Sequence, residues 1–364
     1  MRYQEITIDE IALFLRSDVY KNSKNIPITQ QRALSQIKNP RAGKNDVALI
    51  IALDKTNQIV GFIGMLPEKI PNHPEIKLAW NSCWWVDPKK GKESAIPLFL
   101  KFLKAYDKQV MFRDLTSKTE QILMRFKLFN KVKKLNGYRY FLRLNSKEIL
   151  TKRNRNWLFF SPVLTGIDFV ANTILHFKNE LFLKDFTTSL QVETCKNIDD
   201  EAGEFITKHQ KKELFQRGKA ELNWIINNPW IIKKSLKEEN QHYYFSDANP
   251  NFSNHIFKLY DTKHNLVAVL FLTNVDGLVK LPYVYYESPY LEEMISFIFS
   301  FLIEAKANSV LIFNEKLNQA FQNRKTPFFY VQKIEKDFVV SKKILPFLPK
   351  QFVFQDGEGD FVFT

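Results

Sequence analysis

The sequence of 364 residues predicts a mixed α/β (α+β) protein in which two domains repeat the same order of elements. Each domain is expected to hold a central mixed, mostly antiparallel sheet flanked by helices. Three observations support this. Apolar hairpins around polar turns occur at 46–66 and 255–274. A strand follows each hairpin and ends near a proline, Pro88 or Pro289, which stand 201 positions apart (88 to 289). A helix-length apolar pattern follows each proline.

The elements are expected in the same order in both repeats. In the first repeat these are the hairpin 46–66, a strand 77–88, a helix near 95–103, a strand ending at Phe112, a helix at about 117–128 and two strands, 131–136 and 138–144. In the second they are the hairpin 255–274, a strand 280–289, a helix near 295–302, a strand ending at Phe313, a helix near 315–324 and two strands, 328–334 and 337–343. Phe112 and Phe313 keep the spacing of the prolines, so we expect a duplication.

The predicted domain boundaries follow from this repeat. The first domain covers 1–145, a basic linker with an amphipathic helix covers 146–185, and a second, degenerate domain covers 186–364. An insertion at 198–245 precedes the second hairpin and carries Trp224 and Trp230. Core packing is the simpler interpretation of these tryptophans, and a surface on which a ligand stacks is the alternative.

Residues 157–177 are apolar over 21 positions, nominally long enough to span a bilayer. Pro162, Gly166 and Asp168 argue against a transmembrane span. Polar residues recur every three or four positions, at Ser161, Thr165, Asp168, Asn172 and His176. We therefore expect an amphipathic helix packed between the domains, with a membrane-surface helix as the alternative.

The net charge is +14, and residues 125–155 hold eleven Lys and Arg against Glu148 alone. Such a segment attracts phosphates on a nucleotide cofactor, a nucleic acid or an anionic membrane, or it forms a solvated basic face. The aromatic residues there have strand spacing, which makes nucleic-acid binding the less favoured option. Two cysteines, Cys83 and Cys195, exclude a disulfide framework and a cysteine-based zinc site. The N-terminus lacks the pattern of a signal peptide, so we expect a cytoplasmic protein.

One loop carries a recognisable chemical pattern, at the end of the strand 77–88. It reads Trp84-Trp85-Val86-Asp87-Pro88-Lys89-Lys90-Gly91-Lys92-Glu93-Ser94. Amides exposed at a helix start bind phosphates, and glycine lets the backbone approach them. With the surrounding layout, this run resembles the GNAT superfamily of acyltransferases. The resemblance implies GNAT-like domains and an acetyl-CoA or other acyl-CoA site. Its residues would be Trp85, Val86, Lys89, Lys90, Gly91, Lys92, Glu93 and Ser94. Glu93 departs from the family pattern, which has a glycine or alanine there.

The resemblance also implies a tyrosine near the end of the helix predicted at about 117–128. That tyrosine would be the acid that protonates the leaving thiolate. Phe126 occupies that position, so Tyr138 or Tyr140 would have to replace it, although both also fit simple strand packing. Glu68, just after the first hairpin, is the candidate general base.

The second repeat lacks the loop, because Tyr290 to Ile295 contain two acids, no glycine and no cation. Asp356, Glu358 and Asp360 alternate near the C-terminus and are interpreted as an acidic turn before a last strand, 361–364, with no metal expected. The predicted function is an acyl-CoA-dependent N-acyltransferase that acts on a small-molecule or peptide amine. The alternative is a non-catalytic tandem GNAT-like protein that binds a polyanion or a membrane surface through its basic face. The sequence leaves the oligomeric state open.

Overall fold

The structure is a computed structural model that describes residues 1–184, 188–233 and 241–363. The chain forms two compact units. Unit 1 contains residues 1–135, 197–250 and 336–364, and unit 2 contains residues 136–196 and 251–335. These units differ from the predicted domains 1–145 and 186–364, because the insertion and the C-terminal segment join unit 1.

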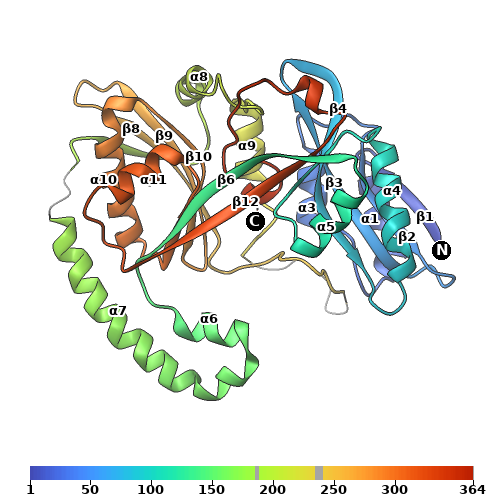
Figure 1. Cartoon of the computed structure of the whole chain (residues 1–364), viewed down its shortest axis with the longest axis horizontal. Coiled ribbons are helices and arrows are strands. Elements are labelled where there is room, and N and C mark those ends of the chain that lie inside the picture. Colours follow the sequence, from blue (N-terminus) through green and yellow to red (C-terminus); the bar gives the residue numbers. More distant parts are fainter. Residues whose placement is uncertain (185–187, 234–240, 364) are drawn as a thin grey trace. The chain divides into compact units, whose positions relative to one another are not determined.

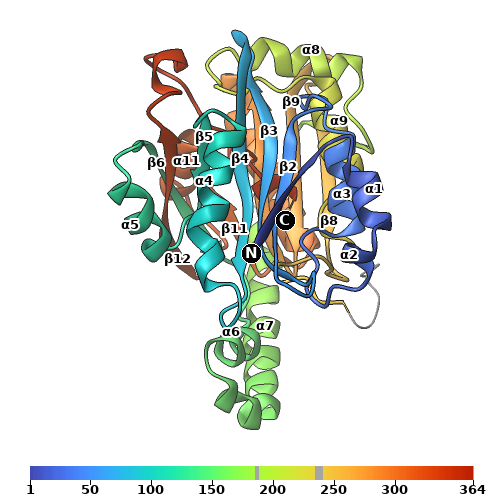
Figure 2. The ribbon, with the colours of Figure 1, turned by 90° about the vertical axis from the view of Figure 1, so that its right-hand side faces the viewer.

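The sheet of unit 1 is mixed. Its strands are β1 (Arg2–Thr7), β2 (Val47–Leu53), β3 (Ile59–Ile70), β4 (His73–Val86), β5 (Val110–Arg113) and the end of β12 (Tyr330–Ser341), in that order. All neighbours are antiparallel except β4 and β5, which are parallel. Figure 2 shows the helices α4 (Ala95–Ala105) and α5 (Ser117–Arg125) on one side of this sheet. On the other side lie α1 (Ile11–Arg16), α2 (Asp18–Lys21) and α3 (Gln30–Ile37). Each face therefore buries its own apolar core.

Unit 2 repeats the arrangement. Its strands are β7 (Gln191–Cys195), β8 (Ser253–Tyr260), β9 (Leu266–Val275), β10 (Leu278–Tyr286), β11 (Ser309–Ile312) and the end of β6 (Phe129–Phe141). Again the pair β10 and β11 is parallel and the other pairs are antiparallel. The helices α10 (Leu291–Glu304) and α11 (Glu315–Gln322) cover a core rich in Phe and Leu. The predicted fold class is confirmed, and the order hairpin, strand, helix, strand and helix is found in both units.

The spacing of the repeat is kept in the hydrogen-bonded ladders. Ala79 pairs with Val110 in unit 1, and Lys280 pairs with Leu311 in unit 2, so both partners are shifted by 201 positions (79 to 280 and 110 to 311). The parallel strand pair is thus built at the same register in the two units. This agreement supports the duplication inferred from the sequence.

The two strands predicted at the end of each repeat are wrong, because each is part of one long strand, β6 or β12. Gly137 lies between the predicted strands 131–136 and 138–144. A Cβ at this position would lie 2.4 Å from the ring of Phe313, so the glycine serves a close approach within a continuous strand. The end of β6 then pairs with β11 of unit 2, and the end of β12 pairs with β5 of unit 1. Each sheet is therefore completed by a strand from the other half of the sequence.

The insertion contributes α8 (Asp200–His209) and α9 (Lys219–Asn227) to unit 1. Trp224 and Trp230 are both buried, as core packing requires. The indole nitrogen of Trp224 donates to the carbonyl of Ser35 at 2.7 Å, and the ring of Trp230 stacks on Phe363 at 4.7 Å. The predicted last strand 361–364 is wrong, because Phe361–Phe363 form a 3-10 turn that packs against these tryptophans.

The apolar segment 157–177 lies in α7 (Ser161–Leu183) and the turn before it, and α6 (Ser146–Arg153) precedes both. The expectation that this helix packs between domains is wrong, since only 6% of its most apolar 18-residue stretch is buried. Within the described residues, Arg155–Leu183 is the helix that is long and apolar enough to cross a membrane by length and composition.

Candidate functional site

The parallel strands β4 and β5 diverge in unit 1. They pair only at Ala79–Val110 and Trp80–Met111, whereas β4 continues to Val86. Its ladder with β3 shifts register at Gly64, and the side-chain amide of Asn81 spans the irregularity by donating to the carbonyls of Gly64 and Cys83. Beyond Trp80, the backbone groups of β4 on the β5 side have no partner strand among the described elements. They are available to an extended polar ligand.

In the loop after β4, the carboxylate of Asp87 binds backbone amides of the same loop. The Oδ1 atom of Asp87 accepts hydrogen bonds from the amides of Lys89 at 2.8 Å and Lys90 at 2.9 Å. These two bonds are the main cause of the lowered pKa of Asp87, so this carboxyl stays ionised at neutral pH. An anion thus already occupies part of the loop whose amides were predicted to bind phosphates.

Position 91 requires glycine because a side chain there has no room. Its φ is −104°, which any residue adopts, but a Cβ would lie 2.0 Å from the carbonyl oxygen of Val60. The amide of Gly91 donates to the Asp87 carbonyl, and the buried Ser94 donates its hydroxyl to the Gly91 carbonyl at 2.6 Å. The loop is therefore held tightly against β3. Within the described part of the chain, the amides of Lys92 and Glu93, which open the helical turn, have no hydrogen-bond acceptor.

The structure brings together all the predicted cofactor residues. The side chains of Lys89, Lys90, Lys92 and Glu93 are exposed around the buried Gly91 and Ser94. Val86 and Trp85 are half-buried at the end of β4, on opposite faces of the sheet. Three cations thus surround the entrance to α4, together with the acid Glu93 that the family pattern lacks.

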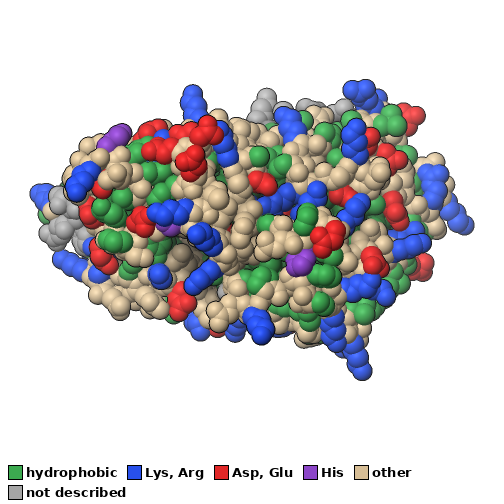
Figure 3. All heavy atoms as spheres, turned by 90° about the horizontal axis from the view of Figure 1, so that it is seen from above, with side chains coloured by type: hydrophobic (Ala, Val, Ile, Leu, Met, Phe, Trp, Pro, Cys, Tyr) green, Lys and Arg blue, Asp and Glu red, His purple; other side chains and the backbone are tan. Residues whose placement is uncertain are grey.

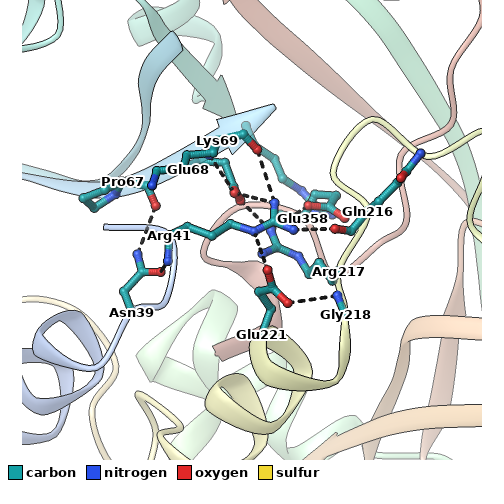
Figure 4. A network of polar contacts seen from close by, with 11 residues as sticks. Asn39, Arg41, Pro67, Glu68, Lys69, Gln216, Arg217, Gly218, Glu221 and Glu358 are labelled. Atoms are coloured by element: carbon teal, nitrogen blue, oxygen red, sulfur yellow. Dashed lines mark hydrogen bonds and ion pairs between the residues drawn. The ribbon is translucent and has the colours of Figure 1, made fainter. Parts of the chain in front are cut away.

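Glu68, the predicted general base, is part of a buried ionic network (Figure 4). Its carboxylate accepts from Arg41 at 2.7 Å and from Arg217 at 2.8 Å, and its side chain is only 2% exposed. Burial raises the pKa of Glu68, but the two guanidinium groups lower it by more, so the net shift is downward. A carboxylate held in this way is a weak base. Its role as a base stays a prediction that this environment does not favour.

Arg217 also contacts Glu358 at 2.7 Å, and Arg41 also contacts Glu221 at 3.2 Å. The network therefore connects β3 to three segments of unit 1 that are remote in sequence: the residues after α3, the insertion, and the C-terminal segment. In Figure 4 the guanidinium groups of Arg41 and Arg217 lie between the carboxylates that they join. This arrangement explains why the insertion and the C-terminal segment belong to unit 1.

The two tyrosines predicted as acids lie on the part of β6 that belongs to unit 2. Tyr140 is buried in the core of that unit, and its hydroxyl contacts Asn318 at 2.9 Å. Desolvation raises the pKa of Tyr140 to about 12. Tyr138 packs against the same core. These contacts account for both residues by packing, and their catalytic role stays a prediction.

Sequence reasoning missed a polar cluster beside the irregularity of β4. A small cavity there is lined by Arg32, Gln36, Ser82, Cys83, Trp230 and Tyr243, on the face of the sheet that carries α3. The Arg32 guanidinium lies 4.5 Å from the ring centre of Trp230 and 5.0 Å from that of Tyr243. Nε of Arg32 and Oε1 of Gln36 are buried without a hydrogen-bond partner in the described structure. No sequence motif joins these residues, so only the fold reveals them.

The reactive groups of this cluster are held in their neutral forms. Burial raises the pKa of the Cys83 thiol to about 11, which leaves it protonated and a poor nucleophile at neutral pH. Burial likewise raises the pKa of Tyr243. The cluster is therefore not suited to covalent catalysis.

Asp360 gives this region a pH dependence, because desolvation raises its pKa to about 6 against the attraction of Arg32 and Arg113. Between about pH 4 and pH 6 the folded chain keeps a proton that the unfolded chain has lost. Stability therefore falls as pH rises through this window. Because Asp360 is partly exposed, we expect only about 1 kcal/mol from this effect. Asp360→Asn should remove it, as measured by denaturant unfolding of both proteins at pH 4.5 and 6.5. An unchanged difference between the two pH values would contradict the assignment.

No protein family model and no curated protein matches the chain. Solved structures do match. One is a conserved protein of unknown function from Enterococcus faecalis, described as a probable N-acyltransferase. It is 10% identical with a TM-score of 0.52, over 96% of this chain and 74% of that one. Another is the Saccharomyces cerevisiae N-myristoyltransferase with bound myristoyl-CoA, 12% identical with a TM-score of 0.51, over 93% and 82% of the two chains.

The chain has a GNAT-like acyltransferase fold. In unit 2, the copy of this fold lacks the basic loop. Only Glu287 separates β10 from the helical turn Ser288–Tyr290, and its amide donates to the carbonyl of Val267 as that of Asp87 does to Val60. Glu292 and Glu293 occupy the first turn of α10. Of the two GNAT-like loops, only that of unit 1 offers positive charge to a phosphate.

The net charge of +14 does not form a purely basic surface on every face of the molecule. On the face seen in Figure 3, Lys and Arg side chains are interspersed with Asp and Glu. Among the described residues, no group of three or more His, Cys, Asp or Glu is placed to hold a metal ion. The chemical features of the fold are thus the divergent strands, the basic loop and the buried polar cluster of unit 1.

Proposed function

We propose that the protein is an acyl-CoA-dependent N-acyltransferase that binds its acyl-CoA on unit 1. The observation that carries this proposal is the divergence of β4 from β5 after Trp80, directly before a loop with three exposed lysines at the start of α4. Unpaired backbone groups of β4 would hold the extended arm of the cofactor. Lys89, Lys90 and Lys92 would attract its phosphates. The similar N-myristoyltransferase carries myristoyl-CoA, which supports an acyl-CoA ligand for this fold.

In the proposed reaction the nitrogen of the acceptor amine attacks the thioester carbonyl, an amide bond forms, and the carbon–sulfur bond breaks. The nitrogen loses a proton and the CoA thiolate gains one, so the products are an amide and free CoA. Orientation and hydrogen bonds to the carbonyl oxygen supply the catalysis. Backbone amides of β4 beyond Trp80 are our candidates for those bonds. The roles of Glu68, Tyr138 and Tyr140 as proton carriers stay predictions: two arginines hold Glu68, which makes it a weak base, and packing in unit 2 accounts for both tyrosines.

The acceptor is proposed to be a small-molecule or peptide amine in the cytoplasm. Arg32 and Gln36 place buried, unsatisfied polar atoms beside the irregularity of β4, but the cavity there measures only about 10 Å³, roughly the space of one water molecule, so it does not admit the acceptor.

The test is calorimetry of the full chain with acetyl-CoA and with myristoyl-CoA, which cover short and long acyl groups. The double variant Lys90→Glu/Lys92→Glu should weaken binding about tenfold or more, because two attractive charges become repulsive. Lys104→Glu is the matched control, since this exposed lysine lies in the last turn of the same helix and should leave affinity unchanged.

Failure of both ligands to bind the unaltered chain would overturn the proposal and leave the non-catalytic alternative, a tandem GNAT-like protein that binds a polyanion or a membrane surface. If Lys90→Glu/Lys92→Glu bound acyl-CoA as tightly as the control Lys104→Glu and the unaltered chain, another part of the chain would hold the cofactor. Two observations favour the non-catalytic alternative. Asp87 already occupies the amides of Lys89 and Lys90, and position 126 holds a phenylalanine where the family has a tyrosine.

A further inference from the structure

The helices α6 and α7 form a hairpin that projects from the sheet of unit 2 (Figure 1). Two sets of hydrogen bonds hold the polar face of α7 against its own unit. Asp168 accepts hydrogen bonds from the amides of Ser146 and Lys147 at the start of α6, at 2.9 and 3.0 Å. Asn172 exchanges two hydrogen bonds of 2.8 Å with the backbone of Leu144. The polar residues of the helix therefore face inward, where they line a cavity of about 390 Å³ beside the end of α10.

The opposite face of α7 is apolar and uncovered. Its residues recur at spacings of four and three, and each is at least 50% exposed: Val163, Ile167, Val170, Ile174, Phe177 and Leu181. The turn that joins the two helices adds the exposed residues Trp157, Leu158, Phe159 and Phe160, with Phe159 at 85% exposure. An apolar surface of this extent on one element marks a binding surface.

Basic residues surround this apolar surface. Lys147, Arg153 and Arg155 on the hairpin and Lys178 and Lys184 near the end of α7 are exposed, with Glu180 as the exposed acid among them. Arg153 and Arg155 directly precede the aromatic turn, Lys178 follows Phe177 of the stripe, and Lys184 follows the last residue of α7. An apolar stripe with aromatic residues and a basic border is complementary to a bilayer with anionic headgroups.

We propose that the α6–α7 hairpin docks on the surface of an anionic phospholipid membrane, with the turn 157–160 and the apolar face of α7 inserted at the headgroup boundary. The polar face rules out a simple span, because α6 packs along α7 and Asp168, in the first half of α7, accepts hydrogen bonds from the start of α6. A spanning position would carry Asp168, its partners and the charged residues of α6 into hydrocarbon. The proposal is independent of acyl-CoA binding by unit 1.

Flotation of the full chain tests this, with vesicles of phosphatidylcholine alone and of phosphatidylcholine mixed with phosphatidylglycerol. We expect binding to the mixed vesicles that weakens as salt increases. Leu158→Ser/Phe159→Ser should reduce it about tenfold or more, because both side chains are exposed and would lose their insertion. Leu13→Ser is the control: this leucine is 73% exposed on α1 of unit 1 and should have no effect.

Arg153→Glu/Arg155→Glu should also reduce binding to the mixed vesicles about tenfold, while Lys104→Glu should leave it unchanged. Alkaline carbonate should release the bound protein, as expected for surface attachment; retention in the membrane would overturn the docked orientation. Absence of binding to either vesicle, or binding that Leu158→Ser/Phe159→Ser leaves unchanged, would overturn the proposal. A lipid-free dimer that Val170→Ser/Ile174→Ser converts to monomers, without vesicle binding, would identify a second copy of the chain as the occupant instead.

Discussion

Replacing Arg217 by methionine is expected to destabilise unit 1 by about 3–5 kcal/mol, because it removes the shared partner of two buried carboxylates. The side chains of Glu68 and Glu358 are 2% and 1% exposed, and Arg217 contacts both. Glu68 would keep Arg41, but Glu358 would lose the ion pair that offsets its burial. Desolvation already raises the pKa of Glu358, and the substitution would raise it further. Unfolding in denaturant at pH 7 measures the loss.

The pH dependence of that loss has a defined sign. A protonated Glu358 needs no counter-charge, so the deficit of Arg217→Met should be smaller at pH 5 than at pH 7. Adding Glu358→Gln to Arg217→Met should restore part of the stability for the same reason. The control is Lys343→Met, which breaks an exposed ion pair with Asp107 and should cost far less stability than Arg217→Met. Equal losses for the two single variants would contradict the role assigned to the buried network.

Gly91→Ala is expected to cost about 3 kcal/mol, near the upper end of the range for overpacking, and to abolish acyl-CoA binding if unit 1 holds the cofactor. The added Cβ would lie 2.0 Å from the Val60 carbonyl oxygen and 2.7 Å from the Asp87 amide nitrogen. Both atoms are backbone, so the loop and not a flexible side chain has to move. Thermal or denaturant unfolding measures the first effect, and calorimetry with acetyl-CoA measures the second.

Gly166→Ala is the matched control, because no heavy atom lies within 4 Å of a Cβ built at this glycine of α7. Replacing a helical glycine by alanine should be neutral or stabilise the chain by up to about 1 kcal/mol. If Gly91→Ala were equally harmless, the loop would be looser than its hydrogen bonds indicate. Since alanine alone already clashes, lysine substitutions in the loop are the cleaner test of cofactor binding.

Periodicity in the sequence predicted the order of the elements because strands and helices bury alternating or helically spaced apolar residues wherever they occur. The hairpins 46–66 and 255–274 became β2–β3 and β8–β9, apart from shifts of a few residues. The loop at 87–94 was found for a similar reason: glycine and lysine at a helix start are a local pattern. Its internal anion was missed, although Asp87 stands in the same run, because occupation of the amides depends on side-chain geometry.

The rest depends on partners that are distant in the chain. Glu68 was interpreted as a base from its position after a hairpin, and only the fold brings Arg217, 149 positions away, against it. The exchange of the final strands was equally hidden, since the close approach that explains Gly137 involves Phe313 from the other repeat.

The sequence by itself determined the mixed α/β architecture, its repetition and the basic loop, because these follow from local spacing and composition. The tertiary structure decided which carboxylates are paired, which strand completes each sheet and which face of α7 is uncovered. Amphipathicity shows that a helix has two faces, but it does not say which one its own protein covers. In α7 the polar face is covered, since Asp168 and Asn172 satisfy backbone groups of unit 2, and the apolar face is left free for a partner.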